Sequence, residues 1–244
     1  MDFESDGVRL HFELHGRDDG RPIVLVHGFA SHYRLNWVGT RWQETLTGAG
    51  FRIIGLDCRG HGQSDKPHGK SAYTARVMAD DVRNLLDHLG VERTEYLGFS
   101  MGARIGLQFV LDHPERVSKA VLAGLGAKGA IDQAPAIARA FRGGTPENEI
   151  AASFYQFASG HKGNDLEALA SCIEGLERDL DPARLAQITT PILVVVGDRD
   201  ELVSGSQDLV EQIPTARLVT VPGRDHLGTV TAREFKQAAL EFLD

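Results

Sequence analysis

A serine lies between two glycines in the segment Gly98-Phe99-Ser100-Met101-Gly102. The segment follows the strand-like run 93–97 and precedes the helix-like run 103–111. A sharp turn from strand to helix exposes such a serine as a nucleophile, and glycines are needed because strand and helix crowd together there. The spacing G-x-S-x-G in this context therefore predicts that Ser100 does nucleophilic chemistry.

A serine hydroxyl is a poor nucleophile while it keeps its proton. It needs a base within hydrogen-bond reach, and a carboxylate that orients the base. The chain has ten histidines and 34 acidic residues that could fill these two roles. Acyl transfer also needs hydrogen-bond donors aimed at the oxygen on which negative charge develops.

The elements that would position these groups alternate between strands and helices. Residues 8–15 alternate apolar and polar positions, which predicts a half-exposed strand in an edge hairpin, whereas 22–26 and 51–56 are short apolar runs typical of strands covered on both faces. Apolar residues recur at helical spacing in 36–46 and 73–89. The later strands are expected at 96–97, 120–125, 192–196 and 217–221. The later helices are expected directly after Ser100, in a segment that ends near 213, and at 232–243. This order predicts an α/β fold: a mainly parallel, doubly wound sheet with right-handed crossovers and helices on both faces.

One segment departs from this alternation. Residues 128–187 are rich in alanine, with helix-like stretches at 135–141, 147–157 and 165–176 and no convincing strand. We interpret 128–187 as a helical cap insertion over the carboxyl edge of the sheet, where open α/β sheets have their pockets. Residues 1–127 and 188–244 would then form the core.

The composition favours small-molecule chemistry. A formal charge of −8 argues against nucleic acid or an anionic membrane as the main partner. Two cysteines, Cys58 and Cys172, are too few for a disulfide framework and lack metal-ligand spacing, which favours reduced thiols. The N-terminus is acidic where a signal peptide is basic, and no apolar run approaches about 18 residues, so we expect a soluble cytoplasmic protein without membrane insertion. The sequence leaves the oligomeric state open.

Five landmarks along the chain resemble the α/β-hydrolase family. Each lies at the end of an expected strand or in the loop after it, and all follow the family order: His27-Gly28-Phe29, the segment 57–64, the segment 98–102, a late acid and a histidine near the end. Serine at the nucleophile position argues against haloalkane dehalogenase and epoxide hydrolase chemistry, for which relatives use aspartate. The resemblance covers nearly the whole chain and implies the α/β-hydrolase fold.

The resemblance also implies the partners of Ser100. His226, expected in the loop after the last strand, would be the general base, and Asp200 would be the acid because Asp200-Glu201-Leu202-Val203 fits the family pattern. Asp198 is the alternative acid. Asp225 is expected to face solvent.

Two further roles follow from the same resemblance. The backbone N–H groups of Phe29 and Met101 would form the oxyanion hole, the second because it opens a helix and has no partner within that helix. His27 and His61 are expected to brace loops.

Aromatic residues are candidates for the substrate pocket. Some of them should line an apolar pocket, although aromatics on short helices also serve to hold those helices on the core. The candidates for substrate binding are Trp37, Phe141, Phe154, Tyr155 and Phe157, with Trp42 as a further residue that could cover the oxyanion loop.

The expected function is hydrolysis of a carboxylic ester of a small apolar substrate through an acyl-enzyme intermediate. A carbon–carbon bond hydrolase or lactonase would use the same triad, and a ligand receptor could be built on the same fold. No cofactor or metal is expected, because 59–64 lacks the G-K-[ST] of a phosphate loop and Gly124-Leu125-Gly126 lacks the third glycine of a dinucleotide fingerprint.

Overall fold

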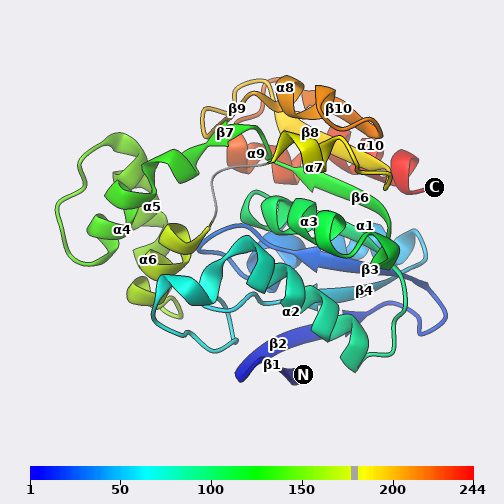
Figure 1. Ribbon diagram of the computed structural model, residues 1–244, viewed down its shortest axis with the longest axis horizontal. Helices are drawn as coiled ribbons and strands as arrows, with labels where there is room; N and C mark the ends of the chain where they lie inside the picture. Colours follow the sequence, from blue (N-terminus) through cyan, green and yellow to red (C-terminus); the bar gives the residue numbers. More distant parts are fainter. Residues whose placement is uncertain (177–180) are drawn as a thin grey trace.

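The computed structural model describes residues 1–176 and 181–244. Within these residues, eight strands form one twisted sheet in the order β1-β2-β4-β3-β5-β6-β8-β10 (Figure 1). The strands are β1 (Asp2–Ser5), β2 (Val8–His15), β3 (Arg21–Val26), β4 (Phe51–Leu56), β5 (Thr94–Phe99), β6 (Val117–Ala123), β8 (Ile192–Gly197) and β10 (Ala216–Val221). The pairs β1·β2 and β2·β4 are antiparallel and the others are parallel. The predicted α/β fold with an edge hairpin is confirmed.

Helices cover both faces of the sheet, as the unbroken apolar strands require. Ile23 and Leu25 of β3 pack on the face covered by α1 (Trp42–Gly48) and α10 (Arg233–Leu243). Val24 and Val26 of the same strand pack on the face covered by α2 (Ala75–His88), α3 (Met101–Asp112) and α8 (Ser206–Glu211). The two-residue period of the strand thus divides one apolar run between two cores.

The loop after β4 is held by buried polar contacts. Arg59 donates two 2.6 Å hydrogen bonds to Asp81 of α2, and both side chains are almost completely buried. Asp57 accepts hydrogen bonds from the backbone N–H groups of Tyr33 (2.7 Å) and Gln63 (2.9 Å). These contacts fix the segment next to the strand ends at which Ser100 lies.

Three short helices gather at one end of the sheet (Figure 1). They are α4 (Ala134–Phe141), α5 (Glu149–Ser159) and α6 (Leu166–Gly175), and together they are called the cap helices below. The side chains of Asn148 and Asp165 accept the N–H groups of Ala151 and Ala168, which explains where α5 and α6 begin. α7 (Pro182–Leu185) instead returns to the core, where Arg184 bonds to the end of α3. Residues 177–180 of the expected cap lie outside the described residues.

The structure corrects two expectations about elements. The expected helix 36–46 is divided into a π-helical turn, Arg34–Val38, and α1, because Arg41 adopts a left-handed conformation with φ 64°. The segment 128–187 was expected to hold no strand, yet β7 (Lys128–Gly129) pairs antiparallel with β9 (Val203–Ser204). Two-residue strands carry no periodicity and arise only from the tertiary pairing.

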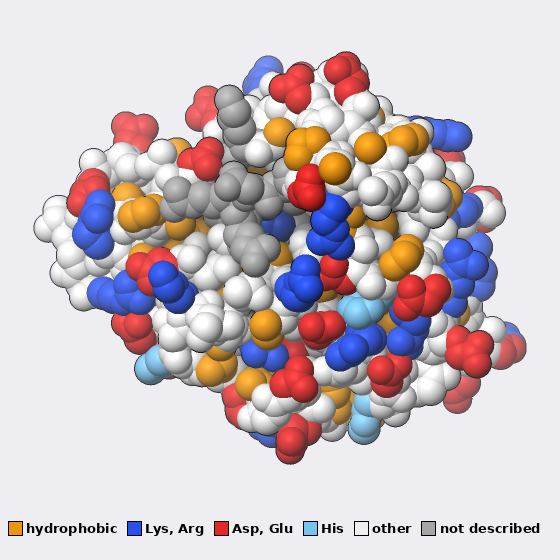
Figure 2. Space-filling view, viewed as in Figure 1, with side chains coloured by type: hydrophobic (Ala, Val, Ile, Leu, Met, Phe, Trp, Pro, Cys, Tyr) orange, Lys and Arg blue, Asp and Glu red, His pale blue; other side chains and the backbone are white. Residues whose placement is uncertain are grey.

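The remaining short elements are the 3₁₀ turns Lys70–Tyr73, Pro114–Arg116 and Ala130–Gln133, and the helix α9 (His226–Thr231). In the described ranges no helix combines the length and the apolar character needed to cross a bilayer. Acidic and basic side chains are interspersed over the face shown in Figure 2.

Candidate active site

Ser100 lies on a strained turn between β5 and α3. Its φ of 54° and ψ of −110° are unusual for a residue with a side chain. A Cβ on Gly98 would lie 2.3 Å from the carbonyl oxygen of Gly102, and one on Gly102 would lie 2.1 Å from that of Val26. The two glycines are therefore required by close backbone contacts on both sides of the serine.

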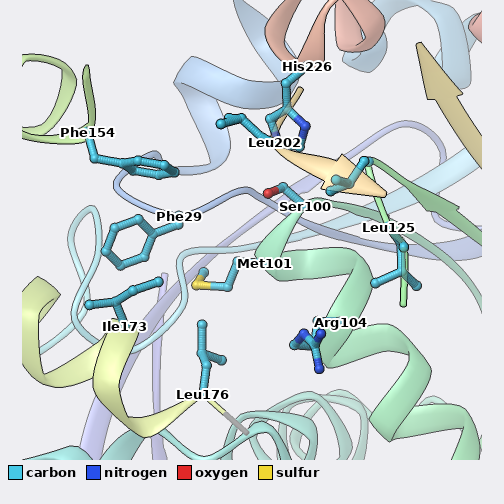
Figure 3. Close-up of a pocket in the computed structure, with 13 residues that line it drawn as sticks. Phe29, Ser100, Met101, Arg104, Leu125, Phe154, Ile173, Leu176, Leu202 and His226 are labelled. Carbon is cyan, nitrogen blue, oxygen red and sulfur yellow. The ribbon is translucent and has the colours of Figure 1, made fainter. Parts of the chain in front are cut away.

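His226 and Asp200 are brought together at the carboxyl end of the sheet. The distance between His226 Nδ1 and Asp200 Oδ2 is 2.7 Å, and the Asp200 side chain is only 1% exposed. Asp200 Oδ1 accepts a second hydrogen bond from the Leu202 N–H at 3.0 Å. A neutral His226 that donates its Nδ1 proton to Asp200 keeps Nε2 free to accept another proton. Figure 3 shows the His226 ring beside the Ser100 hydroxyl.

The other two carboxylates near this site have different contacts. Asp198 is exposed and accepts the Gly223 N–H at 2.6 Å. Asp225 accepts the Gly228 N–H at 2.6 Å and so caps α9. His226 was expected in a loop, but it is the first residue of this helix, because Asp225 provides the cap.

His27 sets the direction of the Phe29 N–H. The Cys58 N–H donates to His27 Nε2 at 3.0 Å, so Nδ1 carries the proton and donates it to the Gly28 carbonyl at 2.8 Å. Burial lowers the pKa of His27, which keeps the ring neutral. In a trans peptide the carbonyl and the next N–H point in opposite directions. Because the Gly28 carbonyl is held by His27, the N–H of Phe29 is directed away from that ring.

His61 is also a fully buried histidine of the loops. Its Nδ1 contacts the Arg59 carbonyl at 2.9 Å, and burial lowers its pKa to about 3. Like His27, it lies within the network that holds the loops together.

Met101 is the first residue of α3, so its N–H lies in the first turn, where no intrahelical acceptor exists. Its side chain is buried with its Sδ 3.9 Å from Cys172 Sγ of α6. The N–H groups of Met101 and Phe29 belong to two residues that both line the hollow beside Ser100.

Two hollows meet at Ser100 and His226. The inner hollow, of about 70 Å³, is lined by Phe29, Ser100, Met101, Arg104, Gly124, Leu125, Gly126, Phe154, Ile173, Leu176, Leu202, Val203 and His226. The outer hollow, of about 310 Å³, shares Phe29, Ser100, Phe154, Leu202 and His226 with it and extends past Phe157, Leu227, Val230 and Thr231. Most of these side chains are apolar, and the cap helices contribute Phe154 from α5 and Ile173 from α6 to the inner hollow (Figure 3).

The structure separates the aromatic candidates. Phe154 and Phe157 line the hollows. Phe141 is buried behind Phe29, with parallel rings whose centroids are 6.0 Å apart. Tyr155 is 38% exposed because it lies on the outer side of α5, and Trp37 is fully buried in the core against Trp42. Neither Tyr155 nor Trp37 is part of the described lining. Their predicted role was wrong because residue type does not show in which direction a side chain points.

Several lining residues were missed from the sequence. Ile173 and Leu176 come from the α6 region, Leu202 follows Asp200, and Arg104 lies one turn after Ser100 on α3. Arg104 could have been found from its i+4 spacing to Ser100, which places it on the same side of the helix. The others have no signal beyond being apolar.

Among residues 1–176 and 181–244, no group of three histidine, cysteine or acidic side chains is placed to hold a metal ion. In the same residues Cys58 and Cys172 are free and buried, and burial raises the pKa of both thiols.

Comparisons with known proteins agree with this fold. A family model described as alpha/beta hydrolase fold matches residues 21–165. The chain is 28% identical to a putative 2-succinyl-6-hydroxy-2,4-cyclohexadiene-1-carboxylate synthase of Bacillus subtilis, over 98% of this chain and 96% of the relative. A hydrolase from Pseudomonas aeruginosa superposes with a TM-score of 0.84 at 28% identity, covering 100% of this chain and 97% of that one. A thermophilic esterase from Thermogutta terrifontis superposes with a TM-score of 0.80 at 26% identity, covering 99% and 96%.

Proposed function

Because the chain belongs to the alpha/beta hydrolase family, we propose that it is a serine hydrolase that cleaves a carboxylic ester of a small apolar substrate. The observation that carries the proposal is the 2.7 Å contact between His226 and the buried carboxylate of Asp200, beside a serine held on a strained turn. The apolar lining of both hollows supports an apolar substrate. The similarity to an esterase of Thermogutta terrifontis supports ester chemistry.

The first half of the reaction forms the acyl-enzyme. His226 Nε2 takes the Ser100 hydroxyl proton as Oγ attacks the ester carbonyl, and the carbonyl electron pair moves onto oxygen. The N–H groups of Phe29 and Met101 donate to this oxyanion, a contribution of about 2.7 to 4 kcal/mol for each donor in enzymes of this type. When the tetrahedral intermediate collapses, the bond to the leaving oxygen breaks and His226 transfers the proton to it.

The second half consumes water. His226 takes a proton from a water molecule whose oxygen attacks the acyl carbon, and the same two N–H groups receive the charge. Collapse returns the proton to Ser100 and releases the carboxylic acid. Asp200 remains ionised throughout and stabilises the imidazolium that forms in each half.

The test uses p-nitrophenyl esters of increasing acyl length with the wild type, Ser100→Ala and His226→Ala. We expect turnover to fall by about 10⁴-fold in each variant, as for removal of comparable triad members. Ser159→Ala on the surface of α5 and His68→Ala, which is 56% exposed, are the matched controls and should retain wild-type rates. An inactive wild type, or an undiminished rate in Ser100→Ala, would refute the proposal. Lactones and ring-fission ketones in the same panel test the two alternatives, a lactonase and a carbon–carbon bond hydrolase.

A further inference from the structure

A surface depression rich in basic side chains adjoins the outer hollow. It is lined by Arg41, Glu44, Thr45, Thr231, Arg233 and Lys236, and it is called the cationic depression below. Thr231 lines both it and the outer hollow, and Thr40 of the outer hollow precedes Arg41. The cationic depression and the outer hollow that reaches Ser100 therefore border each other at Thr231 and at the Thr40–Arg41 step.

Hydrogen bonds join the two sides of the cationic depression, which are the segment around Arg41 and the segment from α9 to the start of α10. Trp42 Nε1 donates to the Val230 carbonyl at 2.8 Å, and Lys236 Nζ donates to the Thr40 carbonyl at 2.6 Å. Partial burial, with the nearby Arg41, lowers the pKa of Lys236. The segment before α1 and the start of α10 thus form a preorganised pair of walls rather than two independent loops.

The charge of the cationic depression is opposite to that of the whole protein. Arg41, Arg233 and Lys236 outnumber Glu44, which is paired with Arg41 at 2.9 Å. The chain as a whole carries a formal charge of −8. A local excess of arginine at the exit of an apolar hollow suits an oxyanion, because the planar guanidinium fork matches the geometry of phosphate.

The position of His226 identifies which end of a substrate would reach these cations. His226 gives its proton to the leaving group, so the leaving group lies on the His226 side of Ser100. From there α9 leads through Leu227 and Val230 to Thr231, and each of these residues lines the outer hollow. We propose, on the basis of the proposed function, that the small apolar part of the natural substrate is its acyl group, that the leaving group carries a phosphate, and that the cationic depression binds this phosphate.

The test compares two thioesters with the same acyl group and the same scissile bond. Butyryl-coenzyme A carries phosphates on its leaving group, and S-butyryl-N-acetylcysteamine is the neutral truncated counterpart. We expect the wild type to show a kcat/KM at least about tenfold higher for the phosphorylated thioester, as expected for charge-assisted hydrogen bonds. This advantage should decrease as salt concentration rises.

The variants Arg41→Gln and Arg233→Gln test the site itself. Each should raise KM for butyryl-coenzyme A by about tenfold and leave hydrolysis of the neutral thioester and of p-nitrophenyl butyrate unchanged. Arg17→Gln is the matched control, because the Arg17 side chain is 81% exposed and is paired with Asp19, away from the cationic depression. Equal losses on both thioesters, or equal kcat/KM for them in the wild type, would overturn the proposal.

A binding measurement separates this proposal from the proposed function. Calorimetric titration of Ser100→Ala with coenzyme A needs no turnover, so it answers the question even if every ester is resistant. We expect binding that weakens about tenfold in the added Arg233→Gln variant. Absence of binding, or inorganic phosphate binding as tightly as coenzyme A, would refute the leaving-group site. Failure of p-nitrophenyl ester hydrolysis would instead refute the esterase proposal alone.

Discussion

Replacing Gly102 with alanine should disrupt the turn that carries Ser100. The added Cβ would lie 2.1 Å from the Val26 carbonyl oxygen and 2.8 Å from that of His27. Both atoms belong to the backbone at the end of a central strand, so no side-chain rotation can relieve the contact. Since non-bonded carbon atoms pack at about 3.5 to 4.0 Å, α3 and β3 would have to separate by more than about 1 Å.

The cost follows from this displacement. Overpacking that flexible side chains can absorb costs about 1 to 3 kcal/mol. For a backbone clash we expect a loss at the upper end, about 3 kcal/mol of unfolding free energy, which lowers the melting temperature of a chain of this size by about 6 to 12 °C. The added Cβ would also displace the His27 backbone, and the His27 side chain holds the Gly28–Phe29 peptide. The Phe29 N–H of the proposed oxyanion hole would therefore move, and esterase turnover in Gly102→Ala should fall as well.

Thermal melts by circular dichroism and p-nitrophenyl ester kinetics measure both effects. Gly48→Ala is the matched control, because a Cβ there meets nothing within 4 Å and the residue ends α1. It should be neutral or stabilising by up to about 1 kcal/mol. A melting temperature of Gly102→Ala within about 2 °C of the wild type would show that the turn tolerates a side chain, contrary to the steric argument.

Two other predictions concern carboxylates and pH. Asp200→Asn should lower turnover by about 10⁴-fold, because an amide cannot stabilise the imidazolium. Asp198→Asn should leave turnover nearly unchanged, since the Asp198 carboxylate accepts a hydrogen bond from the Gly223 N–H and does not contact His226. Stopped-flow ester assays in which Asp198→Asn is the more damaging change would reverse the acid assignment. Burial, and to a smaller extent repulsion from His27, lowers the pKa of His61 from 6.5 to about 3. Between these two pH values the unfolded chain binds a proton at His61 that the folded chain excludes. The free energy of unfolding is therefore highest above pH 6.5 and decreases as the pH falls. From pH 7 to pH 5 this group should remove about 2 kcal/mol of unfolding free energy, measured by urea titration, with a smaller pH dependence in His61→Gln; an unchanged dependence in that variant would contradict the assignment.

The fold could be predicted because its signals are local. Short apolar runs such as 192–196 and helical spacing such as 73–89 report burial and period without knowledge of neighbours. The turn at Ser100 was visible because the spacing G-x-S-x-G between a strand-like and a helix-like run is a local pattern, although Gly102 itself is required by the backbone of Val26 and His27 at the end of β3. Chain order alone then selected His226 from ten histidines.

Features that depend on orientation could not be predicted. Trp37 and Phe154 are both aromatic residues near the expected site, yet one faces the core and the other faces a hollow. The left-handed Arg41 that interrupts the expected helix has no signature in residue type. The family pattern favoured Asp200 over Asp198 as the acid, but the contact itself, between residues 26 positions apart, is seen only in the structure.

The position of the cap helices in the chain, between two paired strands, affects how the sequence of the protein can change among its relatives. They connect β6 to β8, which are paired neighbours in register Ala120 to Ile192, so the sheet itself fixes where this excursion leaves and returns. The entropic cost of closing a flexible excursion rises only by about 0.6 kcal/mol for each doubling of its length. Insertions, deletions or exchange of the cap helices between relatives should therefore alter substrate range at little thermodynamic cost to the sheet that holds Ser100.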